Sequence, residues 1–99
     1  PIGYCLVEID TEKRFINIIK MAVATANRKQ NIGRFVIAKI NELAKNRNLK
    51  GMSLHVRKSN TGAVMFYEKL GFQIIKLLPS YYRKAGLEDA LEMFLNVPH

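Results

Sequence analysis

The sequence predicts an α/β fold in which a mixed, partly antiparallel sheet is flanked by helices. Two segments repeat apolar residues at helical spacing, and segments with the apolar pattern of strands lie before, between and after them. Helices interleaved with strands require at least one parallel strand pair. Apolar residues make up 48% of the chain, which suits a packed core and argues against disorder. At 99 residues we expect a single domain over residues 1–99.

Five segments are predicted as strands. In chain order they are Ile2–Ile9, Phe15–Ala24, Met52–Arg57, Phe72–Leu78 and Ala90–Val97. The second is rich in isoleucine, which is typical of a central and mostly buried strand. The third alternates apolar and polar residues, as a strand with one buried face does. We expect Pro79 to end the fourth strand, because proline cannot donate to a sheet.

Two helices are predicted. The apolar residues of the first are Ile32, Phe35, Val36, Ile40, Leu43 and Ala44, and we expect it to end at residues 46–48. Those of the second are Ala63, Val64, Phe66, Tyr67 and Leu70. Ser59 or Asn60 can cap the N-terminus of the second helix, and Gly71 is placed to follow its C-terminus.

The charge favours a polyanionic partner. The net charge is +8, and seven basic residues but a single acid, Glu42, lie between Arg28 and Lys50. Nucleic acid, an anionic membrane surface and a phosphate-rich cofactor all fit this balance. The basic run lacks the interleaved aromatic residues that single-strand binders use. No apolar run approaches the ~20 residues of a membrane span, so we expect no membrane insertion.

One cysteine cannot form an internal disulfide framework. Cys5 lies in a predicted strand, so a buried and unreactive thiol is the favoured interpretation, with a catalytic thiol as the alternative. The expected compartment is reducing, hence the cytoplasm.

A polar, basic loop over residues 27–31 leads from a strand into the first helix. The first N–H groups of a helix have no intrahelical partner and favour an anion. Arg28 and Lys29 add charge, and Gly33 leaves room for a pyrophosphate near the backbone. Solvated basic residues before a helix are the alternative.

Four blocks in the second half occur in a diagnostic order. They are Leu54–Asn60 (LHVRKSN), Phe66–Phe72 (FYEKLGF), Tyr81-Tyr82 and Glu88-Asp89-Ala90. Together they resemble the GNAT superfamily of acetyltransferases, in the branch that acetylates protein N-termini. That branch includes the catalytic subunit of the ribosome-associated NatA complex, its archaeal counterparts and the bacterial ribosomal-protein alanine acetyltransferase. The resemblance runs from about Ile2 to Val97.

The resemblance implies acetyl-CoA as cosubstrate. Its pyrophosphate loop corresponds to Arg28, Lys29, Gln30, Asn31, Ile32 and Gly33. Asn31 replaces a family glycine, although asparagine tolerates left-handed backbone better than most residues. Backbone groups of Met21, Ala22 and Val23 are expected to line the cofactor between the second and third strands. Asn60 matches an asparagine that contacts the cofactor, and its alternative role is the helix cap.

The resemblance also implies catalytic roles. His55 stands at the position of the general base, although a histidine on a polar strand face is the alternative. Tyr67 stands at the position of the general acid that protonates the departing thiolate, and it can also be a core aromatic. Tyr81 and Tyr82 are expected to hold the substrate peptide, or else to be ordinary strand-end aromatics. Asn17 replaces a catalytic tyrosine of a related branch. No metal is expected.

The family places a strand, two helices and another strand ahead of the position of Ile2. The chain begins with Pro1, so we expect it to be processed or to be the C-terminal catalytic part of a longer domain. The resemblance implies a protein N-terminus or peptide as substrate, the ribosome or an auxiliary subunit as further partners, and self-association through an open sheet edge. A small amine or a lysine is the alternative substrate. A non-catalytic basic module that binds nucleic acid or ribosomes is the second alternative.

Overall fold

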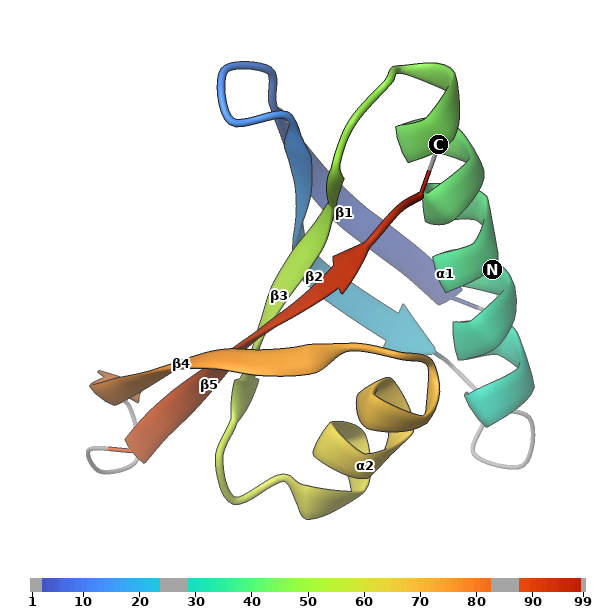
Figure 1. Cartoon of the computed structure of the whole chain (residues 1–99). Coiled ribbons are helices and arrows are strands. Elements are labelled where there is room, and N and C mark those ends of the chain that lie inside the picture. Colours follow the sequence, from blue (N-terminus) through green and yellow to red (C-terminus); the bar gives the residue numbers. More distant parts are fainter. Residues whose placement is uncertain (1–2, 24–28, 83–87, 99) are drawn as a thin grey trace. The chain divides into compact units, whose positions relative to one another are not determined.

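The computed structural model describes residues 3–23, 29–82 and 88–98, with backbone only at 3–4, 20–23, 29–32 and 82. The elements, in order, are β1 (Gly3–Asp10), β2 (Phe15–Val23), α1 (Lys29–Asn46), β3 (Gly51–Arg57), α2 (Thr61–Lys69), β4 (Gln73–Tyr82) and β5 (Glu88–Asn96) (Figure 1). The strands form a five-stranded sheet in the order β1-β2-β3-β5-β4. This confirms the predicted α/β class with a mixed sheet.

The chain divides into two compact units. The first comprises Pro1–Met52 and Asn96–His99, and the second comprises Ser53–Leu95. The first unit contains β1, β2 and α1, and the second contains α2, β4 and nearly all of β5. Each unit has its own buried apolar residues. In the first they are Ile16, Ile18, Ile37, Ile40, Ala44, Leu49, Met52 and Val97, and in the second Leu54, Val56, Phe72, Ala90 and Met93.

A bulged antiparallel hairpin opens the first unit (Figure 1). Strand β1 pairs with β2, and the register shifts between Leu6 and Val7, which leaves Ile19 of β2 without a partner. A bulge turns its extra side chain out of the regular alternation. Ile16 and Ile18 are buried as predicted for this strand, whereas Ile19 is 56% exposed. The prediction of a buried strand therefore holds for Ile16 and Ile18 and fails at Ile19.

Helix α1 begins earlier than predicted, and Ile40 and Ala44 are buried as predicted whereas Phe35 is not. The helix starts at Lys29, so Lys29, Gln30 and Asn31 belong to its first turn and not to the predicted loop. The buried apolar residues include Ile37, while Phe35 is 62% exposed. At 100° per residue these two positions lie on opposite sides of a helix. The Phe35 ring instead has the Lys39 ammonium 5.4 Å from its centre.

Both helices end in the same hydrogen-bonded motif. After α1, Asn48 has a φ of 56°, its N–H donates to the Lys45 carbonyl, and the Leu49 N–H donates to the Ala44 carbonyl. After α2, Gly71 has a φ of 104°, and the N–H groups of Gly71 and Phe72 donate to Glu68 and Tyr67. This is the Schellman motif, which requires a residue that tolerates positive φ. Gly71 thus has its predicted place.

Strand β4 continues through Pro79, contrary to the prediction. The register shifts between Leu78 and Tyr82, so Pro79, Ser80 and Tyr81 together stand opposite Asp89 of β5. Strand β4 is at one end of the strand order, where a proline is tolerated because fewer N–H groups must pair. The prediction failed because Pro79 lies in a bulge of an edge strand, and a bulge does not end the strand.

Cys5 is free and half-buried, not fully buried as predicted. Burial raises the pKa of its thiol. A raised pKa keeps the thiol protonated at neutral pH, and the thiolate is the reactive form. The structure therefore agrees with an unreactive thiol.

Candidate active site

Strand β3 presents its polar side chains on one face. Met52, Leu54 and Val56 are buried, whereas His55 and Arg57 are exposed. Successive side chains of a strand point to opposite sides, so His55 and Arg57 share the side away from the apolar residues. His55, Arg57 and the side chains described below as their partners all belong to the second unit.

His55 contacts side chains from two other strands. Its Nδ1 lies 3.0 Å from the Tyr81 hydroxyl of β4, and the two rings meet edge to face with centres 4.9 Å apart. Its Nε2 lies 3.5 Å from Oε2 of Glu92 on β5. The His55 side chain is 36% exposed and that of Glu92 28% exposed, so both are accessible to a solute. The structure thus brings together a predicted base, a predicted substrate-binding tyrosine and a carboxylate that was not predicted.

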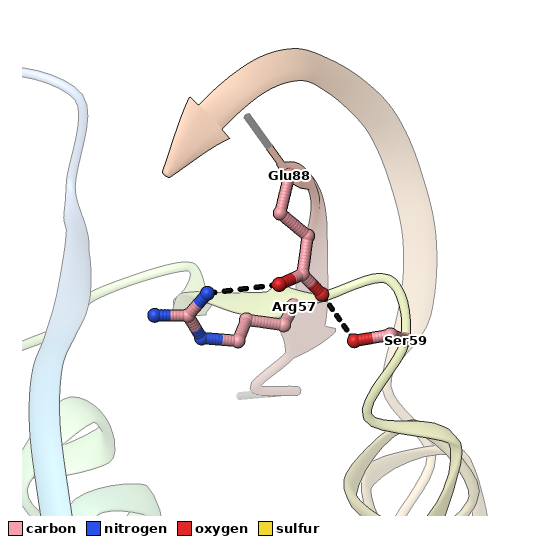
Figure 2. Close-up of polar contacts among 3 residues, drawn as sticks. All are labelled: Arg57, Ser59 and Glu88. Carbon is pink, nitrogen blue, oxygen red and sulfur yellow. Dashed lines mark hydrogen bonds and ion pairs between the residues drawn. The ribbon is translucent and has the colours of Figure 1, made fainter. Parts of the chain in front are cut away.

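A second contact connects β3 with β5, two residues beyond His55, where Arg57 of β3 meets Glu88 of β5. The Arg57 guanidinium donates to Oε2 of Glu88 at 2.9 Å, and the Ser59 hydroxyl donates to Oε1 (Figure 2). These hydrogen bonds, from Ser59 first and then Arg57, lower the pKa of the Glu88 carboxyl. Figure 2 shows the carboxylate between the two donors. Glu88 therefore stays ionised and holds the segment that leads into α2.

Asp89 fixes the backbone of β4 beside Tyr81. Its Oδ1 accepts from the Ser80 N–H at 2.9 Å, and its carbonyl accepts from the Lys58 N–H at 3.0 Å. Ser80 has a φ of 52°, which is uncommon for a residue with a side chain. The Glu-Asp-Ala block of the sequence is therefore structural: Glu88 holds the end of β3, and Asp89 holds the bulge that carries Tyr81.

Tyr67 and Asn60 are placed by the ends of α2. Asn60 is the N-cap, and its side chain accepts from the Ala63 N–H at 3.2 Å, which confirms the predicted cap. Tyr67 is half-buried, with its ring 5.3 Å from that of Phe66 and 5.4 Å from that of Phe72. Asn60 therefore fills its alternative role as the cap, and Tyr67 contacts two aromatic rings while remaining half-buried. Neither excludes the predicted contacts with the cofactor.

The predicted phosphate site lies at the start of the first unit's helix. The first turn of α1 contains no acidic residue. Asn31 lies inside the helix, so it needs no left-handed backbone, and its replacement of a family glycine costs no strain there. Gly33 is buried and lies four residues after Lys29, where a helical N–H is already bonded. The N–H groups open to an anion are those ahead of Gly33.

The remaining predicted residues are described less fully. Arg28 lies outside the described residues. Met21, Ala22 and Val23 pair with Cys5, Tyr4 and Gly3, and Ile32 lies in α1. Tyr82 pairs with Glu88, and Asn17 of β2 is half-buried. The cofactor-lining role of these positions stays a prediction.

Sequence reasoning missed Glu92 and the role of Glu88. The signal was present in the pattern, because His55 and Arg57 lie two apart on one strand and Glu88 and Glu92 lie four apart on another. Both spacings put the members of a pair on one strand face. The pairing of the two strands was the missing information.

Two further structural properties bear on function. Within the described residues, no group of three or more histidine, cysteine, aspartate or glutamate side chains is placed to hold a metal ion. In the same part of the chain, no helix is both long and apolar enough to cross a membrane.

A sequence model of the Acetyltransferase (GNAT) family matches residues 1–72. The chain belongs to the GNAT family. A Drosophila melanogaster protein named probable N-acetyltransferase san is 30% identical over 87% of the chain, which spans 47% of that relative. A Bacillus subtilis protein named as a candidate alanine N-acetyltransferase of ribosomal protein bS18 is 33% identical over 96% of the chain, which spans 61% of it. The GNAT chain thus corresponds to about half to two thirds of these relatives.

Solved structures agree with this membership. Nourseothricin acetyltransferase superimposes with a TM-score of 0.89 and 25% identity, over 98% of this GNAT chain and 58% of that protein. Ard1 from Thermoplasma volcanium superimposes with a TM-score of 0.86 and 26% identity, over 99% of this chain and 64% of that protein. A candidate streptothricin acetyltransferase from Bacillus anthracis was solved with acetyl coenzyme A. It superimposes with a TM-score of 0.83 and 26% identity, over 96% of this chain and 55% of that protein.

Proposed function

We propose that this chain carries the catalytic residues of an N-acetyltransferase that moves the acetyl group of acetyl-CoA to the N-terminal α-amine of a protein or peptide. The observation that carries the proposal is the contact of His55 with Tyr81 on an accessible strand face. Two relatives named for N-acetyl transfer, one of them on a ribosomal protein, support this substrate class.

The cofactor part of the proposal rests on the first turn of α1. It holds no acidic residue, and its leading N–H groups lack intrahelical partners, so it fits the phosphates of acetyl-CoA. The positive charge of Lys29 adds to this fit. The structural neighbour solved with acetyl coenzyme A supports the same cosubstrate. The bound cosubstrate supplies an activated acetyl thioester.

The chain's own residues would prepare the amine. An ammonium group cannot attack a thioester until it loses a proton, and the lone pair of a neutral imidazole at His55 can accept that proton. Tyr67 is proposed as the donor whose phenol protonates the leaving thiolate. The backbone of Tyr67 is held by the Schellman motif, in which its carbonyl accepts a hydrogen bond from the Phe72 N–H. Tyr81 and Tyr82 are proposed to hold the first residues of the substrate. The free thiol of Cys5 suits a reducing compartment, and we propose the cytoplasm.

A small-amine substrate is the second candidate. The observation that favours it is the similarity to nourseothricin acetyltransferase, whose name gives nourseothricin, and not a protein, as the acetylated substrate. The two candidates differ in which part of the acceptor is recognised, because a peptide enzyme must hold the backbone that follows the amine.

A mass-spectrometric assay separates the candidates. The protein would be incubated with acetyl-CoA and three acceptors: peptides with a free N-terminus, the same peptides blocked at the N-terminus but containing lysine, and aminoglycoside or polyamine small amines. We expect an added acetyl group on the free N-termini only. Acetylation confined to small amines would replace the first candidate with the second, and acetylation confined to lysine would also reject it.

A further inference from the structure

Three residues from three strands form a continuous polar chain on the accessible face of β3. In order they are Glu92, His55 and Tyr81, joined by a 3.5 Å contact to Nε2 and a 3.0 Å contact to Nδ1 of the imidazole. A neutral imidazole has one N–H and one lone pair, so its two nitrogens cannot play the same role. The identity of the two neighbours therefore decides which nitrogen is the base.

The Glu92 carboxylate determines the arrangement of protons. An ionised carboxylate only accepts hydrogen bonds, so its negative charge beside Nε2 favours a proton on that nitrogen. Nδ1 is then left with the lone pair, and its neighbour, the Tyr81 hydroxyl, is the group that can donate to it. The base nitrogen of His55 thus faces Tyr81.

The Tyr81 residue is accessible to a solute, because it is 47% exposed. A phenol oxygen can accept one hydrogen bond while its O–H donates another. An amine that approaches this oxygen can give up a proton to it while the phenol passes its own proton to His55.

We propose that Tyr81, His55 and Glu92 form a proton relay, with Tyr81 as the group that touches the substrate amine. In the step, an N–H bond of the substrate ammonium breaks and its proton binds the Tyr81 oxygen. The original Tyr81 proton moves to Nδ1 of His55. The products are a neutral amine, an unchanged phenol and an imidazolium, which the Glu92 carboxylate stabilises. No oxidant, reductant or metal takes part.

The relay rests on the proposed function and refines it. The sequence analysis made His55 the direct base and Tyr81 a substrate-binding residue. The relay makes Tyr81 a catalytic residue and Glu92 a positioning residue that acts through His55. Arg57 and Glu88, which lie on β3 and β5 like His55 and Glu92, are bonded to each other.

The tautomer of His55 is the first test, and it needs no activity. Long-range ¹⁵N–¹H NMR spectra of the ¹⁵N-labelled protein distinguish a proton on Nε2 from one on Nδ1. We expect Nε2–H in the wild type at a pH where the ring is neutral. Glu92→Ala should shift the population toward Nδ1–H, while Glu42→Gln on the exposed surface of α1 should not. A wild-type ring protonated at Nδ1 would overturn the relay.

Kinetics with a peptide substrate is the second test. Tyr81→Phe and His55→Ala should each lower kcat by about a hundredfold or more. The double variant should be no slower than the worse single variant, because residues that act as a unit are not additive. Glu92→Gln should lower kcat by about tenfold with KM unchanged, and Glu42→Gln should match the wild type.

The failures of the two proposals have different signatures. If the wild type acetylates peptides and Tyr81→Phe raises KM while keeping kcat, Tyr81 only binds substrate and the relay is wrong. Multiplicative losses in the double variant would reject it as well. If the wild type acetylates no amine in the presence of acetyl-CoA, the proposed function fails and the relay with it.

Discussion

The backbone N–H of Ser80 donates to Oδ1 of Asp89 at 2.9 Å, across the bulge in β4. Ser80 has positive φ there, and Tyr81 follows it directly. Strain of this kind persists only where surrounding contacts hold it. Asp89 is therefore the residue that keeps Tyr81 within reach of His55.

Asp89→Ala should destabilise the protein by about 1–2 kcal/mol, because a part-buried N–H loses its acceptor. Asp89→Asn should recover most of this, since an amide oxygen can accept the same bond. Urea denaturation measures both variants. Equal losses for the two would show that the carboxylate charge, and not the hydrogen bond, holds the bulge.

Glu88 predicts a pH-dependent stability. Its pKa is lowered in the folded state by Ser59 and Arg57, below the ordinary value of about 4.3. The stabilisation is then fully present above that ordinary value and is lost as the pH falls through the lower, folded value. Glu88→Gln should thus be less stable than the wild type at pH 7, and the difference should shrink as the pH falls below the ordinary value for a glutamate.

The matched control for Glu88 is Glu42→Gln. Glu42 pairs with Lys39 at 3.7 Å, but both side chains are more than half exposed, so this variant should change stability little at any pH. Unfolding curves at several pH values give the comparison. A penalty for Glu88→Gln that does not shrink as the pH is lowered toward acid unfolding would contradict the ionic role of the carboxylate.

Two glycines of α2 and its C-terminus should respond to alanine in opposite ways. Gly71 has a φ of 104°, and an added Cβ would lie 3.2 Å from Cδ1 of Leu95. Gly71→Ala should therefore cost about 1 kcal/mol or more. An added Cβ at Gly62 meets nothing within 4 Å, so Gly62→Ala should stabilise by up to about 1 kcal/mol. Thermal unfolding of both variants checks the sign, and a neutral Gly71→Ala would contradict the strain.

Asn60 allows its structural and predicted cofactor roles to be separated. Asn60→Ala removes the cap on Ala63 and should cost about 0.5–2 kcal/mol. Asn60→Ser keeps a capping oxygen but lacks the amide, so it should keep stability and weaken acetyl-CoA binding. Denaturation and calorimetric titration give the two readouts. Unchanged acetyl-CoA affinity in Asn60→Ser would leave Asn60 with the cap alone.

Features governed by local chemistry were predictable from the sequence. The cap at Asn60 and the positive φ at Gly71 follow from residue types at fixed helix positions. The alternation of β3 likewise placed His55 on the exposed face. Such features depend on a few neighbours along the chain, so a single sequence contains them.

Features governed by strand pairing were not predictable. Pro79 was expected to end β4, but the partner strand β5 accommodates it in a bulge. The contact of Glu92 with His55 exists because β5 neighbours β3 in the sheet, and the spacing of residues in the sequence does not show which strands are neighbours. The exposure of Phe35 depends on how far the buried side of α1 extends around the helix, and apolar spacing alone placed this residue on the buried side. These errors share one cause, which is that the partner of each segment lies far away in sequence.

The melting temperature of the chain with and without acetyl-CoA tests the central proposal most directly. A ligand that binds only the folded state stabilises by about 2.7 kcal/mol at a hundredfold excess over Kd, so we expect a clear rise. Adenosine, which lacks the pyrophosphate, should give little shift, because the first turn of α1 is proposed to bind phosphate. An unchanged melting temperature at millimolar acetyl-CoA would contradict the assignment of this chain as an acetyl-CoA-dependent acetyltransferase.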